Sequence, residues 1–167
     1  MKIRKGKISD LKNIMQMYNS CVSGMIESNI DQWDENYPNS NIITQDLYEE
    51  TYYIAEIKNE IVGGINIDQK QDKTYLEVNW EEKSNLFLVV HRLAVKKEFW
   101  GSKIGKKLML FAEKMGEQKK MNSIRLDTYS GNPKAIEFYR RLKYKERGEI
   151  NLKANKNQYY CFEKIIR

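Results

Sequence analysis

Two short segments in the second half of the chain carry residue types that can bind an anion and move a proton. The first joins an apolar stretch to a turn rich in glycine and lysine, Val90-His91-Arg92-Leu93-Ala94-Val95 and then Trp100-Gly101-Ser102-Lys103-Ile104-Gly105. This order predicts a strand, a turn and a helix, and the first N–H groups of a helix can bind an anion because they lack partners within it. The second segment is Asn132-Pro133-Lys134-Ala135-Ile136-Glu137-Phe138-Tyr139. Asn132 and Tyr139 are two helical turns apart, so both should face one target.

The charges around the first segment favour an anionic ligand. Lys103, Lys106 and Lys107 crowd the first turn of the expected helix, where cations oppose the helix dipole by some 0.3–1 kcal/mol each. A bound anion would remove this conflict. Gly101 and Gly105 let the backbone approach such a ligand closely.

Taken together, the two segments resemble the GNAT N-acetyltransferase superfamily, which transfers an acetyl group from acetyl-coenzyme A (acetyl-CoA) to an amine. The resemblance is close from Leu86 to Glu149 and extends in outline over the rest of the chain. The superfamily's pyrophosphate loop usually reads Gln or Arg, two residues, Gly, one residue, then Gly or Ala. Here Trp100 stands at the first position and Lys103 at the first required glycine, so Gly105 is the one position that matches.

The resemblance implies acetyl-CoA as co-substrate, no metal, and a role for each matching residue. The backbone N–H of Leu93 would donate to the thioester oxygen, an interaction worth about 2.7–4 kcal/mol in other enzymes. Asn132 would bond the pantetheine arm, and Tyr139 would protonate the departing thiolate. The implied acetyl-CoA site consists of Leu93, Ala94, Val95, Trp100, Gly101, Ser102, Lys103, Ile104, Gly105, Lys106, Asn132, Ala135, Phe138 and Tyr139. The alternative is that Phe138 and Tyr139 are two core aromatic residues of an amphipathic helix.

The general base is left open by the sequence. A lysine-like amine is almost fully protonated at pH 7 and needs a strong base, whereas an α-amino group hardly needs one. His91 is the one histidine of the chain and is the catalytic candidate, although a lone histidine on a strand is more often a core residue. Glu77, Glu81, Glu82 and water are the alternatives.

The resemblance implies that the segment from Ile30 to Pro38 borders the acceptor pocket, because the superfamily varies its acceptor pocket there. Gln32, Trp33 and Tyr37 are its candidate substrate-binding residues, and the two rings could form a cation–π wall or instead pin the loop to the domain. Net charge is +4 over residues 1–25, −11 over 26–82 and +13 over 83–167. This asymmetry favours a small cationic amine near the acidic part, unless the charges only form a solvated surface.

Length and periodicity predict the fold. A chain of 167 residues suits one domain, 1–167, of the α+β class. The resemblance adds a mixed central sheet with a splayed pair of parallel strands and helices on both faces. Strands are expected at residues 2–5, 51–57, 61–68, 74–80, 86–95, 123–128, 144–150 and 158–165. Helices are expected after Ser9, after Thr44, from Ile104 to Met115 and from Pro133.

Composition limits the other classes of protein. No apolar run is long enough to span a bilayer, and Cys21 and Cys161 lack disulfide or metal spacing, so we expect reduced thiols in a cytoplasmic protein without a membrane partner. The sequence is compatible with a homodimer. The competing functions are acetylation of a protein N-terminus or lysine, and a basic nucleic-acid-binding module. The basic residues lack the interleaved aromatics of a base-stacking surface, so no nucleic-acid partner is expected.

Overall fold

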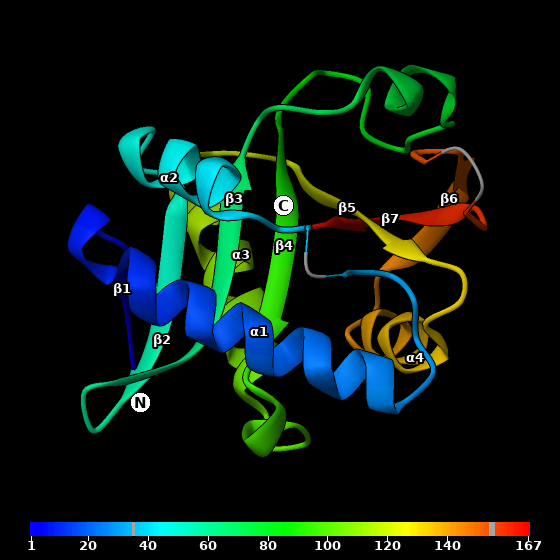
Figure 1. The fold of residues 1–167 in the computed structure, drawn as a ribbon. Coiled ribbons are helices and arrows are strands. Elements are labelled where there is room, and N and C mark those ends of the chain that lie inside the picture. Colours follow the sequence, from blue (N-terminus) through cyan, green and yellow to red (C-terminus); the bar gives the residue numbers. More distant parts are fainter. Residues whose placement is uncertain (35, 154–155) are drawn as a thin grey trace. The chain divides into compact units, whose positions relative to one another are not determined.

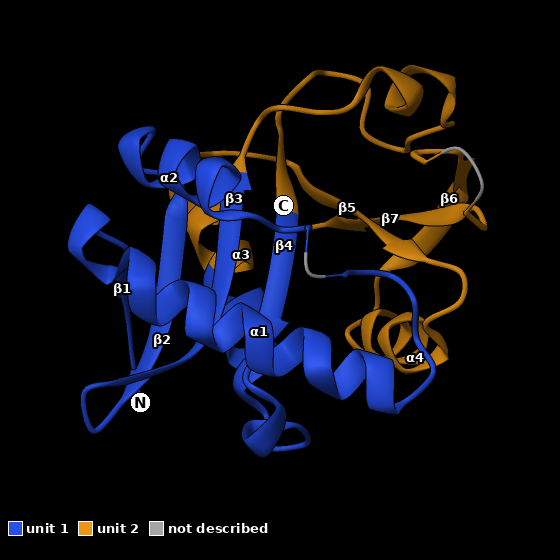
Figure 2. Ribbon diagram, in the orientation of Figure 1, with its two compact units in different colours: residues 1–67, 91–111 blue, residues 68–90, 112–167 orange. Residues whose placement is uncertain are grey.

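The computed structural model describes residues 1–34, 36–153 and 156–167, which form two compact units. Unit 1 comprises residues 1–67 and 91–111, and unit 2 comprises residues 68–90 and 112–167 (Figure 2). A single domain over 1–167 stays a prediction. No helix within the described residues has both the length and the hydropathy needed to cross a membrane.

Unit 1 is built on antiparallel strands. Its elements are β1 (Lys2–Lys5), α1 (Leu11–Glu27), α2 (Ser40–Tyr48), β2 (Tyr52–Ile57), β3 (Glu60–Asp68), the second part of β4 (Phe87–Val95) and the first part of α3 (Ile104–Gln118). β2 pairs with β1 on one side and with β3 on the other. Helices α1 and α2 cover one face of these strands (Figure 1). The opposite face contacts α3, where the rings of Tyr53 and Phe111 lie 5.0 Å apart.

The apolar spacing predicted for the first helix is confirmed in α1. Ile14, Met17, Tyr18, Cys21 and Val22 are buried in a cluster with residues of α2 and the strands. Ile26, near the end of the same helix, is 62% exposed. Met25, one residue earlier, is 8% exposed and belongs to the cluster, so Ile26 points away from the buried face.

Unit 2 holds the first part of β4, the second part of α3, β5 (Ser123–Tyr129), α4 (Pro133–Arg141), β6 (Lys145–Ile150) and β7 (Tyr159–Ile165). β4 pairs with β5 in parallel, through Phe87–Ser123, Leu88–Ile124 and Val89–Arg125. β5 and β6 both pair antiparallel with β7. The strand order β1-β2-β3-β4-β5-β7-β6 confirms the predicted α+β fold with a mixed sheet and one parallel pair.

Three expected elements are wrong in type or boundary. The strand expected at 74–80 is instead a 3-10 helix, Lys73–Glu77, because Asp72 accepts hydrogen bonds from the backbone N–H and the hydroxyl of Thr74. α2 begins at Ser40, capped by the Asn39 side chain, and not after Thr44. Ser9 lies inside a 3-10 turn, Ile8–Asp10, that precedes α1. In all three places a hydrogen bond between a side chain and the nearby backbone accounts for the type or the first residue of the element.

A buried carboxylate ties the irregular part of unit 2 to the sheet. Glu163 of β7 is 0% exposed and accepts hydrogen bonds from Arg125 Nε at 3.2 Å and from the Glu81 backbone N–H at 2.6 Å. The Arg125 guanidinium contacts the faces of two aromatic rings, with its carbon 4.5 Å from the ring centroid of Trp80 and 3.9 Å from that of Phe87. Cation–π contacts and the ion pair therefore hold the segment before β4 in place.

The middle of β4 departs from regular strand geometry at Arg92. Its φ is +52°, in the left-handed region, which costs a non-glycine residue roughly 1–2 kcal/mol. In a regular strand Leu88 and Ala94, six residues apart, would lie on one face. Leu88 instead lies toward Gly116 of α3, and Ala94 packs in the cluster of α1 and α2. The irregular residue reverses the facing of the side chains that follow it.

The strained backbone at Arg92 is held by a network within unit 1. The Arg92 guanidinium donates to both carboxylate oxygens of Asp46, at 2.7 and 2.6 Å from Nη2, and both side chains are largely buried. The Tyr18 hydroxyl donates to the Arg92 carbonyl at 2.7 Å, and Tyr52 donates to Tyr18 at 2.9 Å. Gly64 makes room for Tyr52, because a Cβ there would lie 2.1 Å from the hydroxyl oxygen.

We expect Asp46→Asn to destabilise the protein by about 3 kcal/mol, because the change leaves the buried Arg92 charge without its counterion. Urea unfolding followed by circular dichroism measures the difference. Glu50→Gln, which breaks the exposed pair of Glu50 with Lys5, is the matched control and should change the unfolding midpoint little. Equal midpoints for Asp46→Asn and the wild type would contradict the role assigned to this network.

Candidate active site

The turn between β4 and α3 adopts the backbone conformation that a glycine-rich anion loop requires. Gly101 has a φ of +81° and Lys103 a φ of +69°. Lys103 thus takes the left-handed conformation at the position where the superfamily pattern has glycine. α3 begins directly afterwards at Ile104, which is 3% exposed and anchors the helix start. The turn geometry is kept although one of its usual glycines is absent.

Trp100 fixes this turn to the rest of unit 1. Its indole Nε1 donates to the Val95 carbonyl at 2.8 Å, and the ring packs on α1 at Gly24. A Cβ at Gly24 would lie 2.7 Å from the ring, so the close approach depends on glycine there. The turn is closed further by Ser102, whose backbone N–H donates to the Phe99 carbonyl at 3.2 Å.

The cations of the turn are of two kinds. Lys96 and Lys97 form ion pairs with Glu60 and Glu27. Lys103, Lys106 and Lys107, at the start of α3, are exposed and form no ion pair with any residue in 1–34, 36–153 or 156–167. The helix start therefore offers positive side chains and backbone N–H groups together, which is the combination that binds phosphate.

The backbone of β4 next to the turn is partly used within the protein. The Val95 carbonyl accepts from Trp100, and Val95 also hydrogen bonds through its backbone to Cys21. Burial raises the pKa of the Cys21 thiol to about 11, so this thiol stays protonated. Ala94 is 3% exposed and Leu93 is half-buried. The role of the Leu93 backbone N–H toward a thioester stays a prediction.

The candidate bases differ in their exposure and in the contacts that their side chains make within the protein. Glu81 pairs with Arg147, and Glu82 is 4% exposed and accepts hydrogen bonds from the backbone and the hydroxyl of Ser84. Glu77 is exposed at the end of its 3-10 helix. His91 is half-buried on β4. The two glutamates nearest to β4 thus stabilise unit 2, which disfavours them as bases.

In unit 2, Asn132 begins α4 as the sequence predicts. Its side-chain oxygen accepts from the Ala135 backbone N–H at 3.1 Å, and Pro133 occupies the first helical turn. The residue is 6% exposed. Capping therefore accounts for one of the hydrogen bonds of Asn132, and the proposed bond to pantetheine would use other atoms of the same group.

Aromatic neighbours hold the ring of Tyr139 in place, and its hydroxyl stays available for proton transfer. Its ring lies 5.1 Å from Phe138, 6.1 Å from Tyr144 and 6.0 Å from Phe162. Within the described part of the chain, no group forms a hydrogen bond with this hydroxyl. Burial, and secondarily the charge of Asp127, raises the pKa of Tyr139 well above its usual value. The side chain is therefore protonated at neutral pH, as a proton donor must be.

Asp127 of β5 is a residue that the sequence interpretation missed. It is half-buried, its carboxylate accepts from the Tyr75 hydroxyl at 2.7 Å, and its charge reaches Tyr139. The available signal was a carboxylate in an otherwise buried strand, Ser-Ile-Arg-Leu-Asp-Thr-Tyr. Buried carboxylates are rare without a partner or a function, so this pattern merited a hypothesis.

The loop after α1 is pinned to the core of unit 1. Trp33 is 8% exposed and packs edge-on against Tyr18, with ring centroids 5.8 Å apart, and against Tyr37 at 6.4 Å. Gln32 and Tyr37 are half-buried. The pinning alternative thus describes Trp33, and a contact of these residues with an acceptor stays a prediction.

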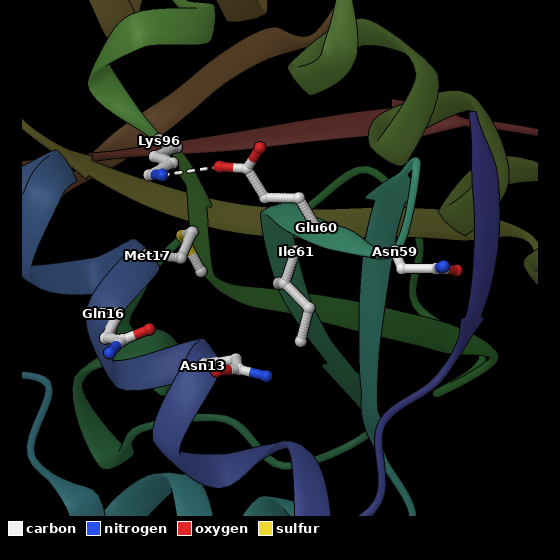
Figure 3. A pocket seen from close by; sticks show the side chains of 7 residues that line it. All are labelled: Asn13, Gln16, Met17, Asn59, Glu60, Ile61 and Lys96. Carbon is white, nitrogen blue, oxygen red and sulfur yellow. Dashed lines mark hydrogen bonds and ion pairs between the residues drawn. The ribbon is translucent and has the colours of Figure 1, made fainter.

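A separate hollow in unit 1 contains none of the predicted site residues. It lies between α1 and the turn that joins β2 to β3, and two of its lining residues, Lys96 and Glu60, form an ion pair 2.6 Å long (Figure 3). Its lining consists of Asn13, Gln16, Met17, Asn59, Glu60, Ile61 and Lys96.

The structure thus brings the predicted residues together in two groups. Unit 1 holds the β4 residues, the turn up to Lys106, and the aromatic loop. Unit 2 holds Asn132, Ala135, Phe138 and Tyr139 on α4, with Asp127 on the strand before it.

Comparison with known proteins extends these findings. The model of the acetyltransferase (GNAT) family matches residues 12–144. A GNAT-family acetyltransferase from Streptococcus agalactiae has a TM-score of 0.83 at 21% identity, over 98% of this chain and 94% of that one. A GNAT-family acetyltransferase from Listeria monocytogenes has a TM-score of 0.76 at 22% identity, with the same coverage.

A further similar structure is the PaiA N-acetyltransferase of Thermoplasma acidophilum in complex with coenzyme A. Its TM-score is 0.72 at 19% identity, and the two chains cover 98% of each other. A comparison with curated protein sequences finds no match. The family model spans most of the chain and includes the turn, the strand and the helix described above, and acetyl-CoA is the co-substrate typical of the family. The chain therefore belongs to the GNAT family of acetyltransferases.

Proposed function

We propose that this acetyltransferase transfers the acetyl group of acetyl-CoA directly to the primary amine of a small cationic molecule. The state of Tyr139 is the observation that supports this reaction. Tyr139 is a buried and protonated tyrosine whose hydroxyl has no hydrogen-bond partner among the described residues. Such a group can give its proton to the thiolate that leaves when the amine displaces it.

Other residues complete the proposed reaction. The start of α3, with Lys103 and Lys106, binds the pyrophosphate of coenzyme A. The Leu93 backbone N–H donates to the thioester oxygen and stabilises the oxyanion that forms on attack. Asn132 bonds the pantetheine arm. Two buried free thiols, Cys21 and Cys161, agree with a reducing compartment, and we place the reaction in the cytoplasm.

The proposed acceptor rests on the charges of the loop after α1. Asp31 and Asp34 are exposed on either side of the anchored Trp33, so they present negative charge at a rigid place. The overall acidity of residues 26–82 contributes less, because in the described part of this segment six carboxylates form ion pairs with basic residues outside it. These pairs are Glu27–Lys97, Asp46–Arg92, Glu50–Lys5, Glu56–Arg4, Glu60–Lys96 and Glu81–Arg147.

A panel of acceptors tests the proposal. Spermidine, kanamycin, lysine and a peptide with a free N-terminus are each incubated with acetyl-CoA, and thiol release is measured at low and high salt. We expect spermidine or kanamycin to be acetylated fastest, with rates that fall as salt screens the loop. Preference for the peptide would instead indicate a protein acetyltransferase. Preference for lysine, or rates independent of salt, would contradict the cationic acceptor and leave the acetyltransferase activity intact.

Tyr139→Phe should lower kcat by about 10²–10⁴ if proton transfer to the thiolate limits the rate, with little change in the affinity for acetyl-CoA. Steady-state kinetics and calorimetry measure the two quantities. Tyr160→Phe removes a hydroxyl from a half-buried tyrosine of β7 in the same unit and serves as the control. An unchanged kcat in Tyr139→Phe would mean that the proton comes from water or another group.

Lys106→Glu should weaken the binding of acetyl-CoA about tenfold, because it replaces an attractive charge by a repulsive one at the start of α3. The loss should shrink as salt is added. Calorimetric titration at two salt concentrations measures it, and Lys114→Glu, an exposed position two turns further along α3, is the control. If both variants bind acetyl-CoA equally well, the helix start does not hold the pyrophosphate.

A further inference from the structure

The peptide group that joins Arg92 to Leu93 is contacted by a side chain on its carbonyl side. A trans peptide group is planar, and its C=O and N–H bonds point in opposite directions. The Arg92 carbonyl and the Leu93 N–H belong to this one group, and the bond between the two residues is trans. A contact that fixes the direction of the carbonyl therefore fixes the direction of the N–H as well.

A tyrosine hydroxyl of α1 makes this contact. Tyr18 donates to the Arg92 carbonyl oxygen at 2.7 Å, the usual length of an O–H···O hydrogen bond, and Tyr18 is 1% exposed. Its ring is held by an edge contact with Trp33, with ring centroids 5.8 Å apart. Burial raises the pKa of Tyr18 well above its usual value, so the hydroxyl keeps its proton and is a donor at neutral pH.

A second hydroxyl strengthens the first. Tyr52 of β2 is 0% exposed and donates to the Tyr18 hydroxyl oxygen at 2.9 Å. Hydrogen bonds in such a chain polarise one another, so the bond from Tyr18 to the carbonyl is stronger than it would be alone. The chain runs from Tyr52 to Tyr18 to Arg92 and ends on the peptide group that carries the Leu93 N–H.

The polarisation continues through the peptide group. A carbonyl that accepts a hydrogen bond draws electron density from its own nitrogen, which makes the N–H more positive and a better donor. Arg92, with a φ of +52°, leaves the strand conformation just before this group, so regular strand geometry does not set its direction. The contact with the carbonyl therefore acts on both the direction of the Leu93 N–H and its strength as a donor.

We propose that Tyr18 is a positioning residue of the acetyl transfer, which orients and polarises the Leu93 N–H for the oxyanion, and that Tyr52 supports it. This inference rests on the proposed function, in which the Leu93 N–H donates to the thioester oxygen. That oxygen gains negative charge when the amine attacks, so a more positive N–H stabilises the transition state more than the ground state. Tyr18 acts through the backbone and does not itself contact the reacting atoms.

The thioester carbonyl of bound acetyl-CoA reports on this donor. Infrared difference spectra of the complex, with and without an isotopic label at the carbonyl carbon, isolate its stretching frequency, which falls as the hydrogen bond to the oxygen strengthens. We expect the frequency in Tyr18→Phe to lie above that of the wild type, and the frequency in Tyr52→Phe to lie between the two. Tyr48→Phe removes the hydroxyl of a 73% exposed tyrosine of α2 and should match the wild type.

Kinetics and binding give a second readout. Loss of a whole oxyanion donor costs about 10²–10³ in kcat in other enzymes, and Tyr18→Phe only weakens one, so we expect kcat to fall about tenfold. The affinity for free coenzyme A, which lacks the thioester carbonyl, should equal that of the wild type. If Tyr18→Phe binds free coenzyme A more weakly and keeps the wild-type carbonyl frequency, Tyr18 only maintains the structure and the inference is wrong.

The spectra separate this inference from the proposed function. A wild-type frequency no lower than that of acetyl-CoA in water would contradict the role of the Leu93 N–H itself. If the wild-type frequency is lowered and Tyr18→Phe shares it, Tyr18 does not act through the peptide group, whatever happens to kcat. Should Tyr18→Phe fail to fold, Tyr52→Phe decides, because it keeps the Tyr18 hydroxyl and removes only its donor. A wild-type frequency in that variant would then overturn the inference.

Discussion

The ion pair between Arg92 and Asp46 is the constraint on which unit 1 depends, because it holds a strand in a conformation that the strand would not adopt alone. The left-handed residue in β4 reverses the facing of the side chains that follow, and it lies directly before the backbone groups of Leu93, Ala94 and Val95. A chain of two tyrosine hydroxyls fixes the carbonyl of the same residue from the other side. The energy stored in this strand is thus balanced by buried polar contacts with α1 and α2.

In unit 2 a different set of contacts holds irregular backbone against the sheet. Glu163 gathers Arg125, Ser123 and the backbone before β4 around one buried carboxylate. The 3-10 helix that carries Tyr75 belongs to this irregular segment, so the place of Asp127 depends on both. Buried ion pairs give little net stability compared with apolar residues, but they fix geometry, and geometry is what a proton-transfer site needs.

The sequence predicted the order of the elements and most of the site because the relevant signals are local. Strand, turn and helix follow from the apolar run into Gly101, and the Asn132-Pro133 start of α4 is a capping pattern. The expected strand at 74–80 failed because Asp72 redirected the backbone, although the alternating residues fit a strand. The bond of Asp127 to Tyr75 and the ion pairs of the acidic segment could not be predicted, since the partners lie 36 to 70 residues apart in the chain.

Because Trp100 is anchored in the turn before α3, its fluorescence can be used to observe this turn in the unlabelled protein. Trp33 and Trp80 are 8% and 5% exposed, whereas Trp100 is 36% exposed. An aqueous quencher such as iodide therefore reaches one indole far more easily than the other two, and the long-wavelength part of the fluorescence spectrum reports on that indole. Any event that shields the turn will appear as protection from quenching and as a blue shift of the emission.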